Sequence, residues 1–269
     1  MEAFLKHVMI ENAGIYTLVG SKPITEFAII PIIDEKEKQE LYNAQTDLFK
    51  KHISFEKFKP TKEDGKKLWR DWKKVENEYL GEQFRFVEDA NWKGGIFINI
   101  RAVLMILDKY YEDFSKVTGQ SFEPDKAVYW VGDHSQSFWR KVQKNHYLMG
   151  LLFGFGEKNA KLFQQESKKM AWFPLRRGTD SPIGSGKGAY DLTIEDLEIP
   201  HFIVFQPIDE QEEKYKNERD KCIQLYRDQD FFELTVGYLK GQQSKKEQKE
   251  LSAEAKELLR QHWNYNSNL

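Results

Sequence analysis

Residues 145–163 read NHYLMGLLFGFGEKNAKLF, and we expect the core of the protein to form around them. The segment from Tyr147 to Gly156 has no charged side chain, in a chain that is 31% charged. An uninterrupted apolar run of this kind is typical of a buried element, so the segment predicts a core helix. It is too short for a transmembrane helix, which needs about 20 mainly apolar residues.

Glycines within this stretch need a physical reason, because glycine inside a helix costs roughly 1 kcal/mol relative to alanine. Gly150 and Gly154 are four residues apart and would share one helical face. His146 belongs to the same face, and Glu157 would return to it if the helix ran unbroken. The pattern has two interpretations: a close contact with a neighbouring helix, or a pocket beside the glycines.

The pocket interpretation makes His146, Glu157 and Asn159 candidate catalytic residues of a hydrolase-type enzyme. It requires His146 to face a cavity that Glu157 or Asn159 also lines. The packing interpretation instead places His146 and Glu157 at the solvated ends of a core helix, with the glycines covered by a neighbouring helix.

The composition limits the classes of function. The chain of 269 residues has 41 Lys and Arg against 43 Asp and Glu, so it carries no overall basic charge and nucleic acid is not an expected partner. The single cysteine, Cys222, excludes an internal disulfide framework and is expected in the core. The N-terminal residues do not resemble a signal peptide, so we expect a cytoplasmic protein, or one exported without such a signal.

The pattern of apolar residues predicts an α+β fold that is predominantly helical, with a small N-terminal β-hairpin packed on a helical core. In the hairpin, residues 15–19 and 24–33 are the strands and residues 20–23 are the turn. Helical periodicity recurs at 34–51, 61–79, 101–117 and 211–229. We expect a single domain over residues 1–241, followed by a charged, partly mobile helix at 242–269.

A second candidate site lies in the region rich in Gly and Pro between residues 168 and 191. Arg176, Arg177 and Lys187 could together hold a carboxylate or a phosphate, although solvated surface residues would show the same pattern. Lys187 lies between two glycines, but the segment lacks the spacing and the Ser or Thr of a phosphate-binding P-loop.

Other reactive residue types form no recognisable motif. The six histidines have no metal-binding spacing, so we expect neither a metal site nor a cofactor. Asp133, His134 and Ser135 are the residue types of a hydrolase triad, but a triad is defined by geometry after folding. A turn that caps the following helix would use the same residues.

Two segments resemble those of an uncharacterised protein family of host-associated bacteria, including chlamydia-like and legionella-like organisms. The segments are GIYTLVGSKPIT at 14–25 and HYLMGLLFGFGEKNAKLF at 146–163. The resemblance implies a bacterial protein, with an effector role as one interpretation, and it brings no activity, cofactor or catalytic residue. The sequence therefore favours a soluble, non-enzymatic binding or interaction protein with a protein partner, and the hydrolase-type enzyme is the alternative.

Overall fold

A computed structural model describes residues 1–29, 35–44, 47–52, 54–55, 65–89, 94–119, 121–166, 176–177, 191–204 and 209–241. The terminal helix expected at 242–269 lies outside these residues. The α-helices are α1 Glu2–Lys6, α2 Ile15–Leu18, α3 Glu35–Asn43, α4 Asp47–His52, α5 Gly65–Tyr79, α6 Ile100–Lys109, α7 Tyr111–Thr118, α8 Pro124–Ala127, α9 Ser137–Val142, α10 His146–Leu152, α11 Glu157–Glu166, α12 Glu210–Tyr226 and α13 Phe231–Leu239. The other helices are the π-helix η1 His7–Glu11 and the 3-10 helices η2 Val128–Trp130 and η4 Ile194–Asp196. The strands are β1 Ile24–Ala28, β2 Phe84–Asp89, β3 Gly94–Asn99, β4 Arg176–Arg177 and β5 Ile203–Val204.

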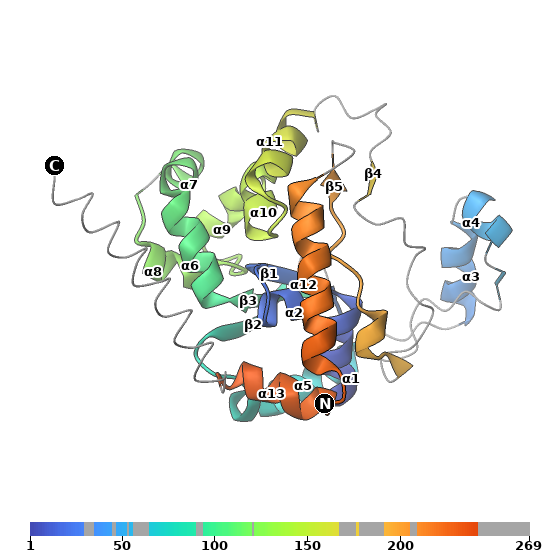
Figure 1. Ribbon diagram of the computed structural model, residues 1–269. Coiled ribbons are helices and arrows are strands. Elements are labelled where there is room, and N and C mark those ends of the chain that lie inside the picture. Colours follow the sequence, from blue (N-terminus) through green and yellow to red (C-terminus); the bar gives the residue numbers. More distant parts are fainter. Residues whose placement is uncertain are drawn as a thin grey trace.

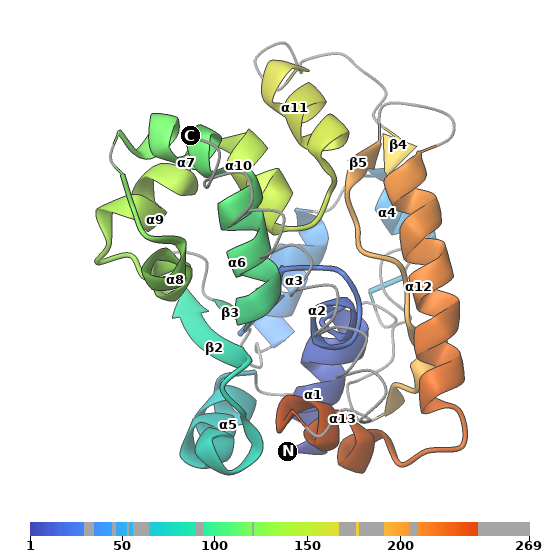
Figure 2. The same ribbon diagram turned by 60° about the vertical axis from the view of Figure 1, so that its left-hand side comes forward.

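An antiparallel three-stranded sheet of order β1-β3-β2 lies at the centre. Every residue of the middle strand β3 is buried, because helices cover both faces of the sheet. Figures 1 and 2 show α6 to α11 on one side of the sheet and α1, α5 and α13 on the other. β4 and β5 form a separate two-stranded ribbon.

The two faces of the sheet belong to two hydrophobic clusters. Alternate residues of β3 separate between them: Phe97 packs in the cluster with α1, α5 and α13, whereas Ile96 and Ile98 pack in the cluster with α6 to α11. In the first cluster, Trp72 of α5 is fully buried and stacks on Phe4 with ring centroids 5.1 Å apart. The sequence of α5 has an apolar stripe at helical spacing, formed by Leu68, Trp72, Val75 and Tyr79 and broadened by Trp69. Both tryptophans are buried, as this stripe predicts.

The predominantly helical α+β class is confirmed, but the prediction of an N-terminal hairpin is wrong. Residues 15–18 form the short helix α2, and β1 pairs with β3, so that Ile24 lies opposite Ile98. Ile15, Tyr16, Thr17 and Leu18 are all buried. A short apolar run that is buried on every side has no periodicity to distinguish a strand from a helix.

Two long helices expected from the sequence are divided in the structure. The one at 101–117 separates at Tyr110 into α6 and α7, and α7 ends at Thr118, where Gly119 follows as the C-cap with φ +66°. The segment at 34–51 contains α3 and α4. None of the helices in the described ranges is long and apolar enough to cross a membrane.

Candidate functional site

The apolar stretch at 145–163 forms two helices joined by a tight turn rather than one unbroken helix. Asn145 caps α10 by accepting a hydrogen bond from the backbone N–H of Leu148. α10 ends at Leu152, and Gly154 and Gly156 then adopt φ of +75° and +80° before α11 begins. A left-handed backbone favours glycine, so these two glycines form the turn and do not continue a helical face.

Gly150 has the packing role expected from the sequence. A Cβ atom at this position would lie only 2.7 Å from the Cβ of Ala160 in α11. The absence of a side chain at Gly150 therefore allows α10 and α11 to approach closely. The Cβ position of Gly154 is covered by the Tyr215 hydroxyl of α12.

α12 holds the turn between α10 and α11 through the carbonyl oxygen of Gly154. This oxygen accepts one hydrogen bond from Nε2 of Gln211 at 2.8 Å and another from the hydroxyl of Tyr215 at 2.7 Å. Tyr215 is fully buried, and burial raises the pKa of its hydroxyl, which therefore remains protonated and able to donate.

We expect Tyr215→Phe to lower the free energy of unfolding by about 1 kcal/mol, the usual net contribution of one hydrogen bond, because Gln211 still binds the Gly154 carbonyl. Urea denaturation measures the change. Tyr129→Phe is the matched control, since its ring is 53% exposed, and it should change the stability by less than about 0.5 kcal/mol. Equal effects of the two substitutions would contradict a role of Tyr215 in holding the turn.

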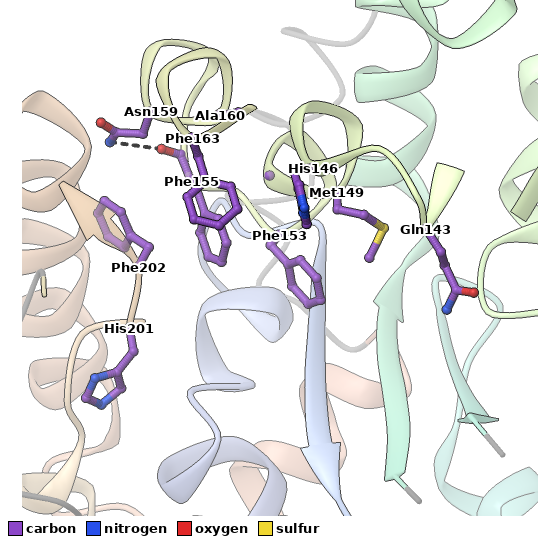
Figure 3. Close-up of a pocket in the computed structure, with 11 residues that line it drawn as sticks. Gln143, His146, Met149, Phe153, Phe155, Asn159, Ala160, Phe163, His201 and Phe202 are labelled. Atoms are coloured by element: carbon purple, nitrogen blue, oxygen red, sulfur yellow. Dashed lines mark hydrogen bonds between the residues drawn. The ribbon is translucent and has the colours of Figure 1, made fainter. Parts of the chain in front are cut away.

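A cavity of about 400 Å³ lies beside α10 and α11. It is lined mainly by aromatic and other apolar side chains, which come from α10, the turn, α11 and the segment that leads into β5 (Figure 3). The lining residues are Gln143, His146, Met149, Gly150, Phe153, Phe155, Asn159, Ala160, Phe163, His201 and Phe202. Phe153, Phe155 and Phe202 form a continuous series, with ring centroids 5.5 Å and then 5.6 Å apart.

Two of the three candidate catalytic residues line this cavity. His146 is at its wall and meets the ring of Phe163 edge-to-face at 5.1 Å. Asn159 is 4% exposed, and its amide donates to the carbonyl oxygen of Phe155 at 3.1 Å, which ties α11 to the turn (Figure 3). Asn159 therefore has a structural role in addition to lining the cavity.

Glu157 is not among the lining residues. Its carboxylate accepts hydrogen bonds from Lys161 at 2.5 Å and from the Tyr110 hydroxyl at 3.0 Å. These two bonds, with that of Lys161 the stronger, hold the pKa of Glu157 below its usual value. The expected grouping of Glu157 with His146 is therefore wrong, because the turn at Gly154 and Gly156 interrupts the helical face that would have joined them.

A polar group that the sequence does not reveal adjoins the cavity at Gln143. Nε2 of Gln143 donates to the carboxylate of Asp89 at 3.2 Å, and Nε2 of His134 lies 2.9 Å from the other carboxylate oxygen. The Asp89 side chain is fully buried at the end of β2. Asp133, next to His134, accepts a hydrogen bond from the backbone N–H of Ser135, which fits the turn interpretation of these residues.

Lys22 is the second group that the sequence does not reveal. It precedes β1, its side chain is only 5% exposed, and its ammonium nitrogen lies 5.8 Å from the ring centroid of Phe153. Nζ donates to the hydroxyl of Thr25 at 2.9 Å. Burial lowers the pKa of Lys22 to about 7, and the charge of Glu26 opposes this shift.

Two of the three candidate anion-binding residues lie within the described structure. Arg176 and Arg177 form strand β4, which pairs antiparallel with Ile203 and Val204 of β5. Lys187 lies outside the described residues.

No cluster of three or more His, Cys, Asp or Glu suited to a metal ion occurs within the described part of the chain. Cys222 is buried, and burial raises the pKa of its thiol to about 12.

Comparison with known proteins identifies no relative: no family model, no curated protein and no solved structure matches this chain.

Proposed function

We propose that the protein is a non-enzymatic binding protein that takes a small, mainly apolar ligand into the cavity beside α10 and α11. One observation carries the proposal: a volume of about 400 Å³ bounded by four phenylalanine rings and a methionine, with a few polar side chains among them. Ligand pockets of this size and composition are common, and their apolar walls supply affinity while the polar groups orient the ligand.

The lining residues favour binding over hydrolysis. None of the described residues around the cavity is a serine, threonine, cysteine, aspartate or glutamate. Two histidines, His146 and His201, line the cavity and could act as general bases, but covalent hydrolysis also requires a nucleophilic side chain. His146 has Phe163 as its neighbour there, and Glu157 is engaged by Lys161 and Tyr110.

Cavity binding is tested with the fluorescent dye 8-anilinonaphthalene-1-sulfonate and a substitution that fills the cavity. Met149→Trp replaces an unbranched side chain of the wall with a bulky indole ring and should weaken dye binding at least tenfold. Met105→Trp makes the same change at a side chain on α6 that is 46% exposed, and should leave the affinity unchanged.

Dye fluorescence titrations measure both affinities, and circular dichroism establishes that each variant is folded. Equal affinity of the wild-type protein and a folded Met149→Trp variant would contradict binding in this cavity. A loss of affinity in both variants would place the dye elsewhere and contradict it as well.

A further inference from the structure

Lys22 is unusual because its charged end is buried with no carboxylate within salt-bridge distance among the described residues. Within the described residues, its Nζ atom has one hydrogen-bond acceptor, the Thr25 hydroxyl, and the face of the Phe153 ring. Lysine is almost never fully buried unless it is paired with an acidic group. A fully buried ammonium with three donors and one acceptor carries a large desolvation cost, which favours the neutral amine.

Lys22 also has polar and charged neighbours that act on its amine. Thr25 is hydrogen-bonded at 2.8 Å to the hydroxyl of Thr17, so a short polar chain ends at the amine. Glu26 is the charged group that acts on Lys22, and Asp89 in turn acts on Glu26. Partial burial, and then the negative charge of Asp89, raise the pKa of Glu26, and the charge of Lys22 opposes this shift.

The amine is also next to the cavity. Phe153 contributes its ring to the cavity wall, and the Lys22 nitrogen approaches that same ring. The stem of Lys22 passes the turn, since its Cγ lies 3.3 Å from the Cβ position of Gly154. The absence of a side chain at Gly154 therefore leaves room for the lysine beneath the turn.

From this geometry we infer that Lys22 is a reactive amine of the cavity and forms an imine with an aldehyde whose remaining part is aromatic or alkyl. The inference rests on the proposed function, because the same cavity must take up the apolar part of the ligand. Displacement of the Phe153 ring brings the nitrogen into contact with the ligand. A neutral amine is a good nucleophile, and lysines desolvated in apolar pockets serve in this way.

The reaction balances without an oxidant or a reductant. The lone pair of Nζ attacks the carbonyl carbon and gives a carbinolamine. The carbinolamine then loses its hydroxyl group and the remaining nitrogen-bound hydrogen as water, which leaves a C=N bond between Lys22 and the ligand. Water reverses the reaction, so the adduct accumulates only while the cavity holds the ligand.

The test uses 3-phenylpropanal with sodium cyanoborohydride, which delivers hydride to the imine and converts it to a stable secondary amine. Peptide mass mapping then compares labelling of Lys22 with that of the exposed lysines Lys144 and Lys158. We expect Lys22 to be labelled at least tenfold faster at pH 7, with a rate that rises as the pH passes through about 7. Labelling of Lys22 at or below the rate of the exposed lysines would overturn the inference.

Two variants test the route to the amine. Phe153→Ala removes the ring between the amine and the cavity and should accelerate labelling of Lys22 severalfold. Lys22→Met should abolish the rapid labelling that is assigned to Lys22 and leave the labelling rates of Lys144 and Lys158 unchanged. An unchanged rate in a folded Phe153→Ala variant would contradict access from the cavity.

The alcohol 3-phenylpropan-1-ol separates failure of this inference from failure of the proposed function, because it has the same apolar skeleton and cannot form an imine. If the alcohol displaces the dye from the cavity but the aldehyde spares Lys22, the imine inference is overturned and the binding function stands. If neither compound displaces the dye and Lys22 is not labelled, both are overturned.

Discussion

Replacement of Gly150 by leucine should lower the free energy of unfolding by at least about 3 kcal/mol, the upper part of the usual range for overpacking. The first atom of any side chain at Gly150 would lie 2.7 Å from the Cβ of Ala160 and 3.2 Å from its Cα. Both neighbours belong to the backbone or the first side-chain atom of α11, so neither can move without displacing that helix. At about 2–4 °C per kcal/mol, the melting temperature should fall by roughly 6–12 °C.

A reciprocal exchange separates this contact from general effects of changing a glycine. Gly150→Ala should gain about 1 kcal/mol in helix propensity and lose more to the clash with Ala160. Ala160→Gly removes the nearest clashing atom, so the Gly150→Ala, Ala160→Gly double variant should be more stable than the sum of the single changes predicts. Additive effects, or an unchanged melting temperature for Gly150→Leu, would mean that α10 and α11 do not depend on this contact.

The sequence predicts the parts of the fold that depend on local pattern. The apolar stripe of α5 correctly predicts buried Trp69 and Trp72, because a 3.6-residue period needs no knowledge of the partner surface. The apolar character of α10 likewise predicts its burial. A close contact at Gly150 is predictable on similar grounds, because glycine weakens a core helix unless a neighbouring element needs the space.

The parts of the site that could not be predicted depend on long-range contacts. Gly20, Ser21, Lys22 and Pro23 have the composition of an exposed turn, but packing against Phe153 and Gly154 buries the lysine. No local signal gives this, because the partner lies more than a hundred residues away in the chain. His134 and Asp89 are also brought together only by the fold, since Asp89 ends β2 and His134 lies between η2 and α9.

The burial of Lys22 should make the stability of the protein depend on pH above neutrality. Its pKa is about 7 in the folded protein and 10.5 in the unfolded chain, so between these values the unfolded chain binds more protons. Stability therefore rises with pH in this window, by at most about 1.4 kcal/mol per pH unit for one proton. Below pH 7 the amine is protonated in both states, and the full cost of burying the charge is present.

Lys22→Met removes this titration and retains an unbranched side chain of similar length. Urea denaturation at several pH values gives the free energy of unfolding of both proteins. In the difference between them, the contributions of the titratable groups that they share cancel. The stability of the wild-type protein relative to Lys22→Met should rise by about 2 kcal/mol between pH 7 and pH 9 and remain constant below pH 6. A constant difference across the whole range would show that Lys22 keeps its charge in the folded protein, and an ammonium cannot attack an aldehyde. Burial of Lys22 therefore has two linked effects: it costs stability while the amine is protonated, and it makes the amine neutral and reactive near pH 7.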